Sequence, residues 1–305
     1  MTTTNTYTDT KAVDYLQTIK KNQLEARNVK SSSSNFDMTY MLARDSEITI
    51  DTDATATAQT LADYDVVDNT GKCIVYLPFD LDTLDASNNN DGTITGTETY
   101  VDGPEISSSH PMRKAFSFNG STYITLANES NFDLDRTSAM SWSFWIKTTD
   151  NTYNPIFMKM KSTANFEGIW LHMNTGQITL EIYSTTGTGV IVATDNTYND
   201  GLWHHVCVTK STSSAYSGIN IYVDGVTVAK INFRDDLDGT ILNNNSPIIG
   251  AESDGTDFAV MSLKDFSMWN VELTQDDVTR LSGGRQISKD TTATNPAYFG
   301  FSDVT

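Results

Sequence analysis

Between Cys73 and Trp269 the sequence alternates between short apolar stretches and polar turns rich in Gly, Asn, Asp and Ser, and this texture restricts the fold more than any other feature. Many short strands joined by close turns are typical of a β-sandwich or jelly roll. The sequence therefore predicts an all-β domain. We expect its strands at residues 74–77, 115–118, 123–126, 141–147, 155–159, 168–173, 178–183, 190–194, 204–210, 219–223, 226–231 and 258–269.

Local patterns agree with this prediction. Residues alternate along 141–146, so Trp142 should face one side of its strand and Trp145 the other. The dipeptide Asp224-Gly225 predicts a hairpin, because these residues tolerate the positive φ angles of a type I′ turn. A short helix should close the domain, with Thr274 as its N-cap and Gly283 at its end.

The segment that precedes this domain has a different character. Residues 9–29 predict one amphipathic helix, in which Leu16, Ile19 and Leu24 contribute to a narrow apolar stripe. Such a helix needs a partner surface, so we expect it to pack on another subunit or, alternatively, on its own domain. The predicted organisation is an extended, helix-containing N-terminal arm at 1–70, a β domain at 71–283 and a C-terminal tail at 284–305.

The charge of the chain excludes some partners. Its formal net charge is −19 at pH 7, whereas phosphate groups are bound by clustered Lys and Arg. We therefore expect no nucleic acid partner and no membrane partner. No apolar run reaches the ~20 residues of a membrane span, and the N-terminus lacks the basic and apolar regions of a signal peptide, so we expect neither membrane insertion nor export by a cleaved signal.

Residues that could support catalysis are dispersed. Glu181 stands alone in its predicted strand, whereas retaining glycosidases need two carboxyl groups about 5 Å apart. There is no Gly-x-Ser-x-Gly elbow, and the four histidines are too scattered to predict a metal site. Cys73 and Cys207 are expected to be free thiols, with a disulfide left open because sequence does not show whether their strands adjoin. We expect a protein that is not an enzyme.

Six short motifs follow one another in an order that resembles a known family. They are Tyr76-Leu77-Pro78-Phe79-Asp80, Ala115-Phe116-Ser117-Phe118-Asn119-Gly120, Ser143-Phe144-Trp145-Ile146-Lys147, Gly201-Leu202-Trp203-His204-His205-Val206, Tyr222-Val223-Asp224-Gly225 and Leu263-Lys264-Asp265-Phe266-Ser267-Met268-Trp269. Over residues 73–282 the chain resembles the laminin G-like domains of the concanavalin A-like lectin and glucanase superfamily. The resemblance implies a jelly-roll sandwich.

The resemblance also implies a bound calcium ion, since family members often hold one. Calcium prefers six to eight oxygen ligands. The matching positions are Asp80, Asp82, Asn119 and Asp265, and Asn119 stands where many relatives have Asp. The alternative is that these side chains order their loops by hydrogen bonds.

Glycan binding is the second function that the resemblance implies. In this fold, exposed aromatic side chains stack on sugars while amides and carboxylates bind their hydroxyls. Sequence does not separate exposed aromatic residues from buried ones, so each candidate is also a candidate for packing. The candidates are Trp145, Trp170, Tyr153, Tyr198 and Tyr216.

Three functions are compatible with these observations, because one fold serves many roles. The first is a virion structural protein, such as a bacteriophage capsid decoration, head-fibre or tail component. Its arm would bind other virion proteins or copies of itself, and its jelly roll would face outward and could bind host or environmental glycans. The second is a non-catalytic carbohydrate-binding module of an extracellular or cell-surface protein, and the third a carbohydrate-active enzyme. The absence of a secretion signal favours the virion.

Overall fold

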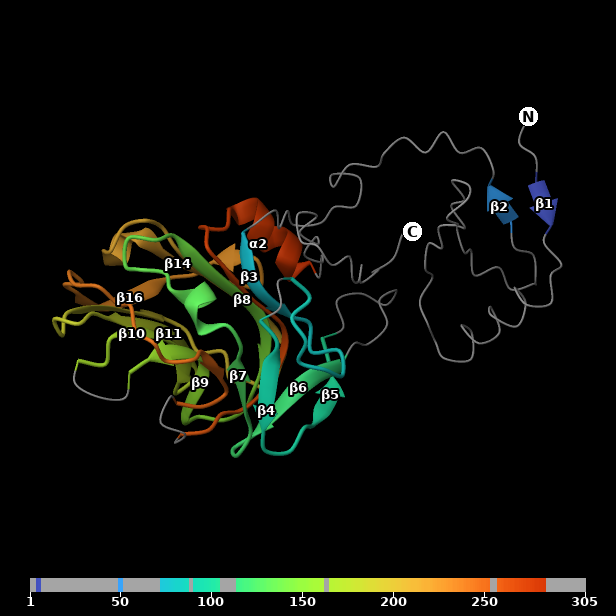
Figure 1. The fold of residues 1–305 in the computed structure, drawn as a ribbon, viewed down its shortest axis with the longest axis horizontal. Helices are drawn as coiled ribbons and strands as arrows, with labels where there is room; N and C mark the ends of the chain where they lie inside the picture. Colours follow the sequence, from blue (N-terminus) through green and yellow to red (C-terminus); the bar gives the residue numbers. More distant parts are fainter. Residues whose placement is uncertain are drawn as a thin grey trace. The chain divides into compact units, whose positions relative to one another are not determined.

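The computed structural model describes residues 72–87, 90–104, 114–161, 165–252 and 257–283, together with two short strands nearer the N-terminus (Figure 1). Those two strands, β1 (Thr4–Thr6) and β2 (Thr49–Asp51), pair in antiparallel fashion with Asn5 opposite Ile50. They belong to one unit of the chain, Met1–Asp65 with Phe299–Thr305, and the other described elements belong to a second unit, Val66–Tyr298.

The predicted arm and tail lie largely outside this description. The helix expected at 9–29 falls outside the described residues, and so do its apolar positions Leu16, Ile19 and Leu24. The same holds for the tail at 284–305. The arm and its assembly role therefore stay predictions.

The second unit is a jelly-roll sandwich of two antiparallel sheets, which confirms the predicted fold (Figure 1). We name each sheet after a central strand. The β10 sheet has the order β16 (Lys230–Asp235), β12 (Gly189–Thr194), β11 (Gln177–Tyr183), β10 (Gly168–Asn174), β9 (Tyr153–Met160), β17 (Ile248–Ile249), β7 (Tyr123–Leu126) and β4 (Gly92–Thr95). The β8 sheet has the order β15 (Val226–Thr227), β14 (Ile219–Val223), β13 (His204–Lys210), β8 (Met140–Lys147), β18 (Val260–Trp269), β6 (Lys114–Asn119) and β5 (Tyr100–Asp102), and β3 (Cys73–Leu77) also pairs with β18.

The main core fills the space between the two sheets. Because side chains alternate along a strand, every second residue of each strand faces inward. Phe157 of the β10 sheet lies with its ring centroid 5.9 Å from Phe266 and 6.2 Å from Trp142, both of the β8 sheet. These three side chains are fully buried, so aromatic contacts join the two layers at the centre of the domain.

A smaller core lies on the opposite, outer side of the β8 sheet. Helix α2 (Gln275–Ser282) packs Val278 and Leu281 against Trp269 and its neighbours there. Thr274 caps the helix as predicted, since its hydroxyl accepts from the Asp277 N–H and the Asp277 carboxylate accepts from the Thr274 N–H. Cys73 and Cys207 are buried in the same small core and form no disulfide with each other.

Strand β18 serves both cores because of a β-bulge. Lys264 pairs with Trp145 and Ser267 pairs with Ser143, so Asp265 and Phe266 together oppose a single residue of β8. Asp265 takes a φ of 51° at this point. The extra residue leaves Lys264 and Asp265 outside the main core and returns Phe266 to it.

The sequence predicted most strands and the hairpin at Asp224 and Gly225, whose φ angles are 52° and 79°. The single strand expected at 226–231 is wrong. The chain leaves the β8 sheet after β15 and enters the β10 sheet with β16, and apolar alternation cannot reveal such a switch. Strands β4, β5 and β17 were not predicted, because each has four residues or fewer. None of the helices that the structure describes has the length and apolar character needed to cross a membrane.

Candidate functional site

A group of aromatic and charged side chains lies on the outer face of the β10 sheet. We call it the Trp170 cluster, and its members are Tyr153, Trp170, His172, Glu181, Tyr183 and Arg234. Trp170 and His172 alternate along β10 with residues of the main core, which places both on the outer face. The register then sets Trp170 opposite Glu181 and brings Arg234 of β16 into the same line across the sheet through Ile191 of β12.

Three rings pack together at the centre of the cluster. The ring centroids of Tyr153 and Trp170 are 5.4 Å apart in an edge-to-face arrangement. His172 lies 4.9 Å from Tyr153 and 5.2 Å from Trp170. Trp170 and Tyr153 are half-buried, whereas His172 is 2% exposed, so the rings present a partly exposed apolar surface over a buried imidazole.

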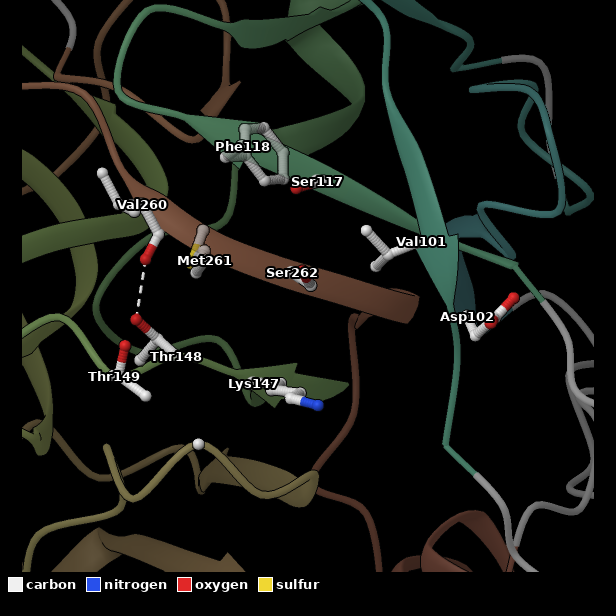
Figure 2. A pocket seen from close by; sticks show the side chains of 11 residues that line it. Val101, Asp102, Ser117, Phe118, Lys147, Thr148, Thr149, Val260, Met261 and Ser262 are labelled. Carbon is white, nitrogen blue, oxygen red and sulfur yellow. Dashed lines mark hydrogen bonds between the residues drawn. The ribbon is translucent and has the colours of Figure 1, made fainter.

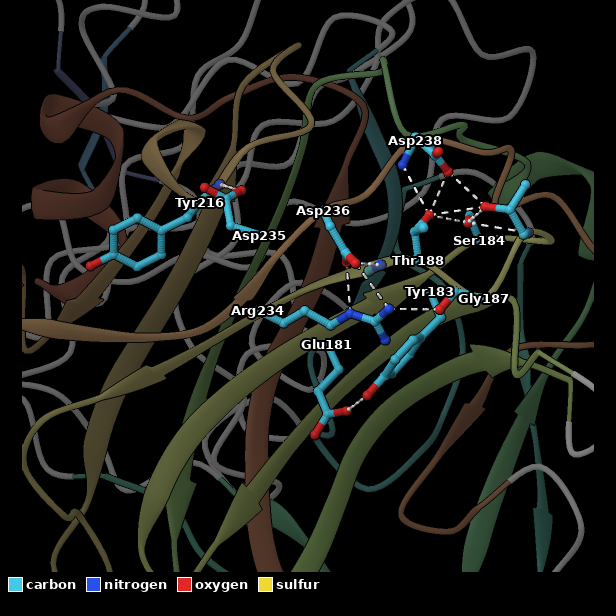
Figure 3. Close-up of polar contacts among 12 residues, drawn as sticks. Glu181, Tyr183, Ser184, Gly187, Thr188, Tyr216, Arg234, Asp235, Asp236 and Asp238 are labelled. Atoms are coloured by element: carbon cyan, nitrogen blue, oxygen red, sulfur yellow. Dashed lines mark hydrogen bonds and ion pairs between the residues drawn. The ribbon is translucent and has the colours of Figure 1, made fainter.

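Glu181 is held in place by its neighbours. Its Oε1 lies 3.0 Å from His172 Nε2, and its Oε2 accepts a hydrogen bond of 2.9 Å from the Tyr183 hydroxyl, as Figure 3 shows for the tyrosine. Burial, followed by the Glu181 carboxylate, raises the pKa of Tyr183 to about 12, so this phenol stays protonated and donates. The carboxylate is therefore a fixed acceptor on the surface of the sheet.

Arg234 completes the cluster on the β16 side. Its Nε donates to the Asp236 carboxylate at 2.7 Å and an Nη donates to the Gly187 carbonyl at 2.7 Å (Figure 3). The guanidinium also lies over the Tyr183 ring, 5.6 Å from its centroid. These contacts hold the Arg234 side chain in place, and Asp236 compensates its positive charge.

A network of hydrogen-bonded hydroxyl groups connects the adjoining loops. Asp238 Oδ1 accepts hydrogen bonds from Thr186 at 2.6 Å and from Thr188 at 2.5 Å, and the Ser184 hydroxyl contacts both threonines (Figure 3). The two threonine hydroxyls lower the pKa of Asp238. The loop after β11 and the loop after β16 are thus tied together beside the cluster.

The cluster has unused hydrogen-bonding capacity and a negative environment. Among the residues that the structure describes, Trp170 Nε1 and His172 Nδ1 are buried without a hydrogen-bond partner. Burial raises the pKa of Tyr153, and the carboxylates of Glu252, Glu181 and Asp257 raise it further. Several carboxylates therefore lie near the half-buried rings.

The structure brings together two of the five predicted glycan contacts, Tyr153 and Trp170, and separates the other three. Trp145 is half-buried on the other sheet. The Tyr198 ring packs edge-to-face on His204, with centroids 5.4 Å apart. Tyr216 lies under the Lys230 ammonium, 4.5 Å from its ring centroid, and donates its hydroxyl to the Lys230 carbonyl.

Trp145 belongs to a buried polar group on the β8 sheet. Its ring lies 5.3 Å from that of His205, which is 1% exposed. The His205 Nε2 and the Ser143 hydroxyl are 2.9 Å apart, and no hydrogen-bond partner of His205 Nδ1 occurs in the described part of the chain. Burial lowers the pKa of His205 to about 4, against the opposing effect of Asp224 and Asp265.

The predicted calcium ligands Asp80 and Asp265 surround an ammonium group. Lys264 Nζ lies 2.7 Å from Asp80 Oδ1 and 3.5 Å from Asp265 Oδ1, and it donates to the Pro78 carbonyl at 2.8 Å. The Lys264 side chain is 1% exposed. A calcium ion at these carboxylates would meet a fixed positive charge, so this pair does not fit the ion.

The other two predicted ligands make local contacts. Asp82 accepts from the Leu84 N–H at 3.2 Å, and Asn119 Oδ1 accepts from the Ser121 N–H and from the hydroxyls of Ser121 and Thr122. Across the described ranges, no group of three or more His, Cys, Asp and Glu residues is placed to hold a metal ion. Calcium binding stays a prediction, and the residues present do not favour it.

The β8 sheet carries a shallow depression of about 440 Å³ near its β5 edge (Figure 2). Ser117, Lys147 and Ser262 lie side by side on neighbouring strands in its lining. None of the five predicted aromatic contacts lines it, and its one aromatic residue, Phe118, is 2% exposed. The depression therefore offers no ring for stacking.

Comparison with known proteins agrees with this fold. A laminin G model, described as the Concanavalin A-like lectin/glucanases superfamily, matches residues 118–279. No curated protein matches the sequence.

Among solved structures, the binding domain of Paraclostridial Mosquitocidal Protein 1 is similar with a TM-score of 0.54 and 16% identity, over 70% of this chain and 52% of the other. The botulinum neurotoxin serotype G binding domain has a TM-score of 0.52 and 17% identity, over 69% and 50% of the two chains. The receptor-binding domain of botulinum neurotoxin C/D mosaic serotype has a TM-score of 0.51 and 18% identity, over 71% and 52%. The chain thus spans about half the length of these structures, and at such identities the likeness concerns the fold. Since the family model covers more than half of the sequence, the chain belongs to the concanavalin A-like lectin and glucanase superfamily.

Proposed function

We propose that this chain is a non-catalytic carbohydrate-binding domain and that the Trp170 cluster is its binding surface. The observation that carries the proposal is the position of the half-buried Trp170 ring directly opposite the Glu181 carboxylate on the outer face of the β10 sheet. A sugar ring has an apolar face of C–H groups and a rim of hydroxyls. An aromatic ring matches the face, and a fixed carboxylate matches the hydroxyls.

The rigidity of the cluster supports this role. Its members stand on strands, and the two oxygens of Glu181 are already positioned by His172 and Tyr183. A surface that is ordered before binding loses little conformational entropy when the ligand arrives. The buried nitrogens of Trp170 and His172 that lack a protein partner are groups that an ordered water could satisfy beneath the rings.

Related structures give this proposal a precedent. One similar structure is a binding domain of botulinum neurotoxin DC in complex with SialylT, and another is described by cell entry of botulinum neurotoxin type C that depends on two ganglioside molecules. Both have TM-scores of 0.50, and this chain covers 52% of each. Their ligands support carbohydrate recognition by proteins that contain this fold.

The biological setting is a separate question. A virion structural role, in a capsid decoration, head fibre or tail of a bacteriophage, stays a prediction that depends on residues 1–70. An extracellular or cell-surface location is the alternative. A carbohydrate-binding face suits either setting, because both place the domain next to glycans.

Two tryptophans provide a matched test of the proposed surface. Trp170 and Trp145 are both half-buried, but they stand on the outer faces of different sheets. The full chain and the variants Trp170→Ala and Trp145→Ala would be applied to a glycan array, and the affinity of any ligand found would be measured by calorimetry. We expect Trp170→Ala to weaken binding at least tenfold, about 1.4 kcal/mol, and Trp145→Ala to leave it unchanged.

Circular dichroism and thermal melting would show that each variant is folded. A loss confined to Trp145→Ala would move the site to the β8 sheet and refute the assignment. Absence of binding to every glycan by the unmodified chain would refute the proposed function itself.

A further inference from the structure

We infer that the Trp170 cluster selects uncharged saccharides and rejects those that carry carboxylate or sulfate groups. This inference rests on the proposed function and specifies the chemical class of its ligand. It is carried by the charges in and around the cluster.

The positive charge of the cluster is already paired. Arg234 is the only Lys or Arg in the cluster, and the described contacts of its Nε and one Nη go to Asp236 and to the Gly187 carbonyl. Asp236 raises the pKa of Arg234, as expected for a paired guanidinium. Anion recognition by arginine uses the same fork of N–H groups in bidentate contact. Because the Nε and one Nη face Asp236, an incoming carboxylate would have to displace an existing ion pair to form a bidentate contact through them.

Carboxylates make the surroundings of the Trp170 cluster negative. Glu181 stands beside Trp170, and Glu252 and Asp257 lie close enough to Tyr153 to raise its pKa. The carboxylate of Glu181 is 17% exposed, so water screens it only in part. An acidic sugar on the Trp170 ring would bring one more negative charge to this surface. A neutral sugar would instead donate hydroxyl hydrogens to the same carboxylates.

The net charge of the whole chain also acts on an approaching glycan. Its formal net charge of −19 adds a long-range repulsion that an anionic glycan must overcome during approach. Salt screens such exposed charges within about 10 Å at 0.1 M ionic strength, so this component must weaken as salt is added. The carboxylates near the cluster and the net charge of the chain therefore both disfavour an anionic glycan.

The experiment compares matched glycans on the full chain. An array would carry lactosamine and glucan backbones, each in neutral and in sulfated form, together with sialylated lactosamine. We expect each neutral backbone that binds to bind at least about tenfold more tightly than its acidic form at low salt, and the ratio to shrink as salt is added.

Charge variants connect the preference to the cluster. Replacing Glu181 and Glu252 in the variant Glu181→Gln/Glu252→Gln should bring the neutral-to-acidic ratio closer to one, even if both affinities fall. Glu272→Gln/Asp276→Asn is the matched control, because it also removes two exposed carboxylates, one just before α2 and one on α2, which packs on the other sheet, and it should leave the ratio unchanged.

The outcomes separate the two claims. Equal or tighter binding of the acidic forms would overturn the inference while leaving the proposed function standing. A ratio that falls equally in the Glu272→Gln/Asp276→Asn control would also overturn it, because total charge would then explain the preference. If no glycan binds in any form, the proposed function fails and the inference fails with it.

Discussion

The buried His205 makes the stability of this domain depend on acid in a way that can be calculated. Its imidazole is 1% exposed, next to Trp145 and within hydrogen-bond distance of Ser143. Burial lowers its pKa to about 4, whereas a histidine in an unfolded chain titrates near 6.5. Below pH 6.5 the unfolded chain therefore takes up a proton that the folded chain does not.

This pKa difference determines the sign and size of the change in the free energy of unfolding with pH. The stability that His205 contributes is fully present above pH 6.5 and is lost progressively as the pH falls towards 4. A gap of about 2.5 pH units corresponds to about 3 kcal/mol in the free energy of unfolding at pH 4, and to about 2 kcal/mol at pH 5. Asp224 and Asp265 oppose the effect of burial, and the pKa of about 4 already includes their contribution.

Urea unfolding of the full chain at pH 7, 5 and 4 would test the calculation. The variant His205→Gln keeps a polar group near Ser143 but cannot titrate, so the unmodified chain should lose about 3 kcal/mol more than the variant between pH 7 and 4. Equal losses in both proteins would refute the reasoning. NMR titration of the His205 ring gives an independent check, and a pKa near 6.5 in the folded protein would refute it as well.

Two further perturbations test features of the β8 sheet. Replacing Lys264 by Gln should destabilise the domain by about 1–2 kcal/mol, less than a fully buried pair because Asp80 is 43% exposed, while Lys147→Gln at an exposed site should have little effect. Millimolar calcium should leave the melting temperature of the unmodified chain unchanged, and a clear rise would mean that Lys264 does not take the place of the ion. Replacing Gly225 by Ala should cost about 1 kcal/mol, measured by urea unfolding, because its φ is 79°. The control Gly283→Ala has a φ of −78° and should be close to neutral, so equal effects would contradict the turn geometry.

The sequence predicted the fold well wherever a strand is buried and follows its neighbour in the chain. Strand β14 was predicted to the residue, because Ile219, Ile221 and Val223 alternate and the Asp224-Gly225 turn marks its end. The failure at 226–231 has a different cause. Thr227 pairs with Tyr222 in a local hairpin, whereas Lys230 pairs with Thr194 of β12 in the other sheet, and this second pairing is long-range.

The candidate site was predicted only in part. Trp170 and Tyr153 were identified as aromatic residues, but Glu181 was considered only as an isolated carboxylate. The period-two spacing of Trp170 with His172, and of Glu181 with Tyr183, was a signal that each pair shares a face. Strands β10 and β11 form a hairpin across Thr175 and Gly176, whose φ angles are 48° and 86°. This two-residue turn was a second hairpin signal that the prediction did not use, and its register brings His172 to Glu181.

The bulge at Asp265 also bears on how this chain can change in length. A strand keeps its orientation by counting residues in twos, so losing one residue turns every later side chain over. Asp265 is the exception, because it is the extra residue of the bulge. Without it, Phe266 would follow Lys264 directly and still oppose Phe144, so Met268 would stay between the sheets and Trp269 on the outer side. Loss of Ser267, by contrast, would turn Met268 outward and Trp269 inward and would disturb the attachment of α2. The bulge is therefore the place where this strand can lose a residue without exchanging the contents of its two cores.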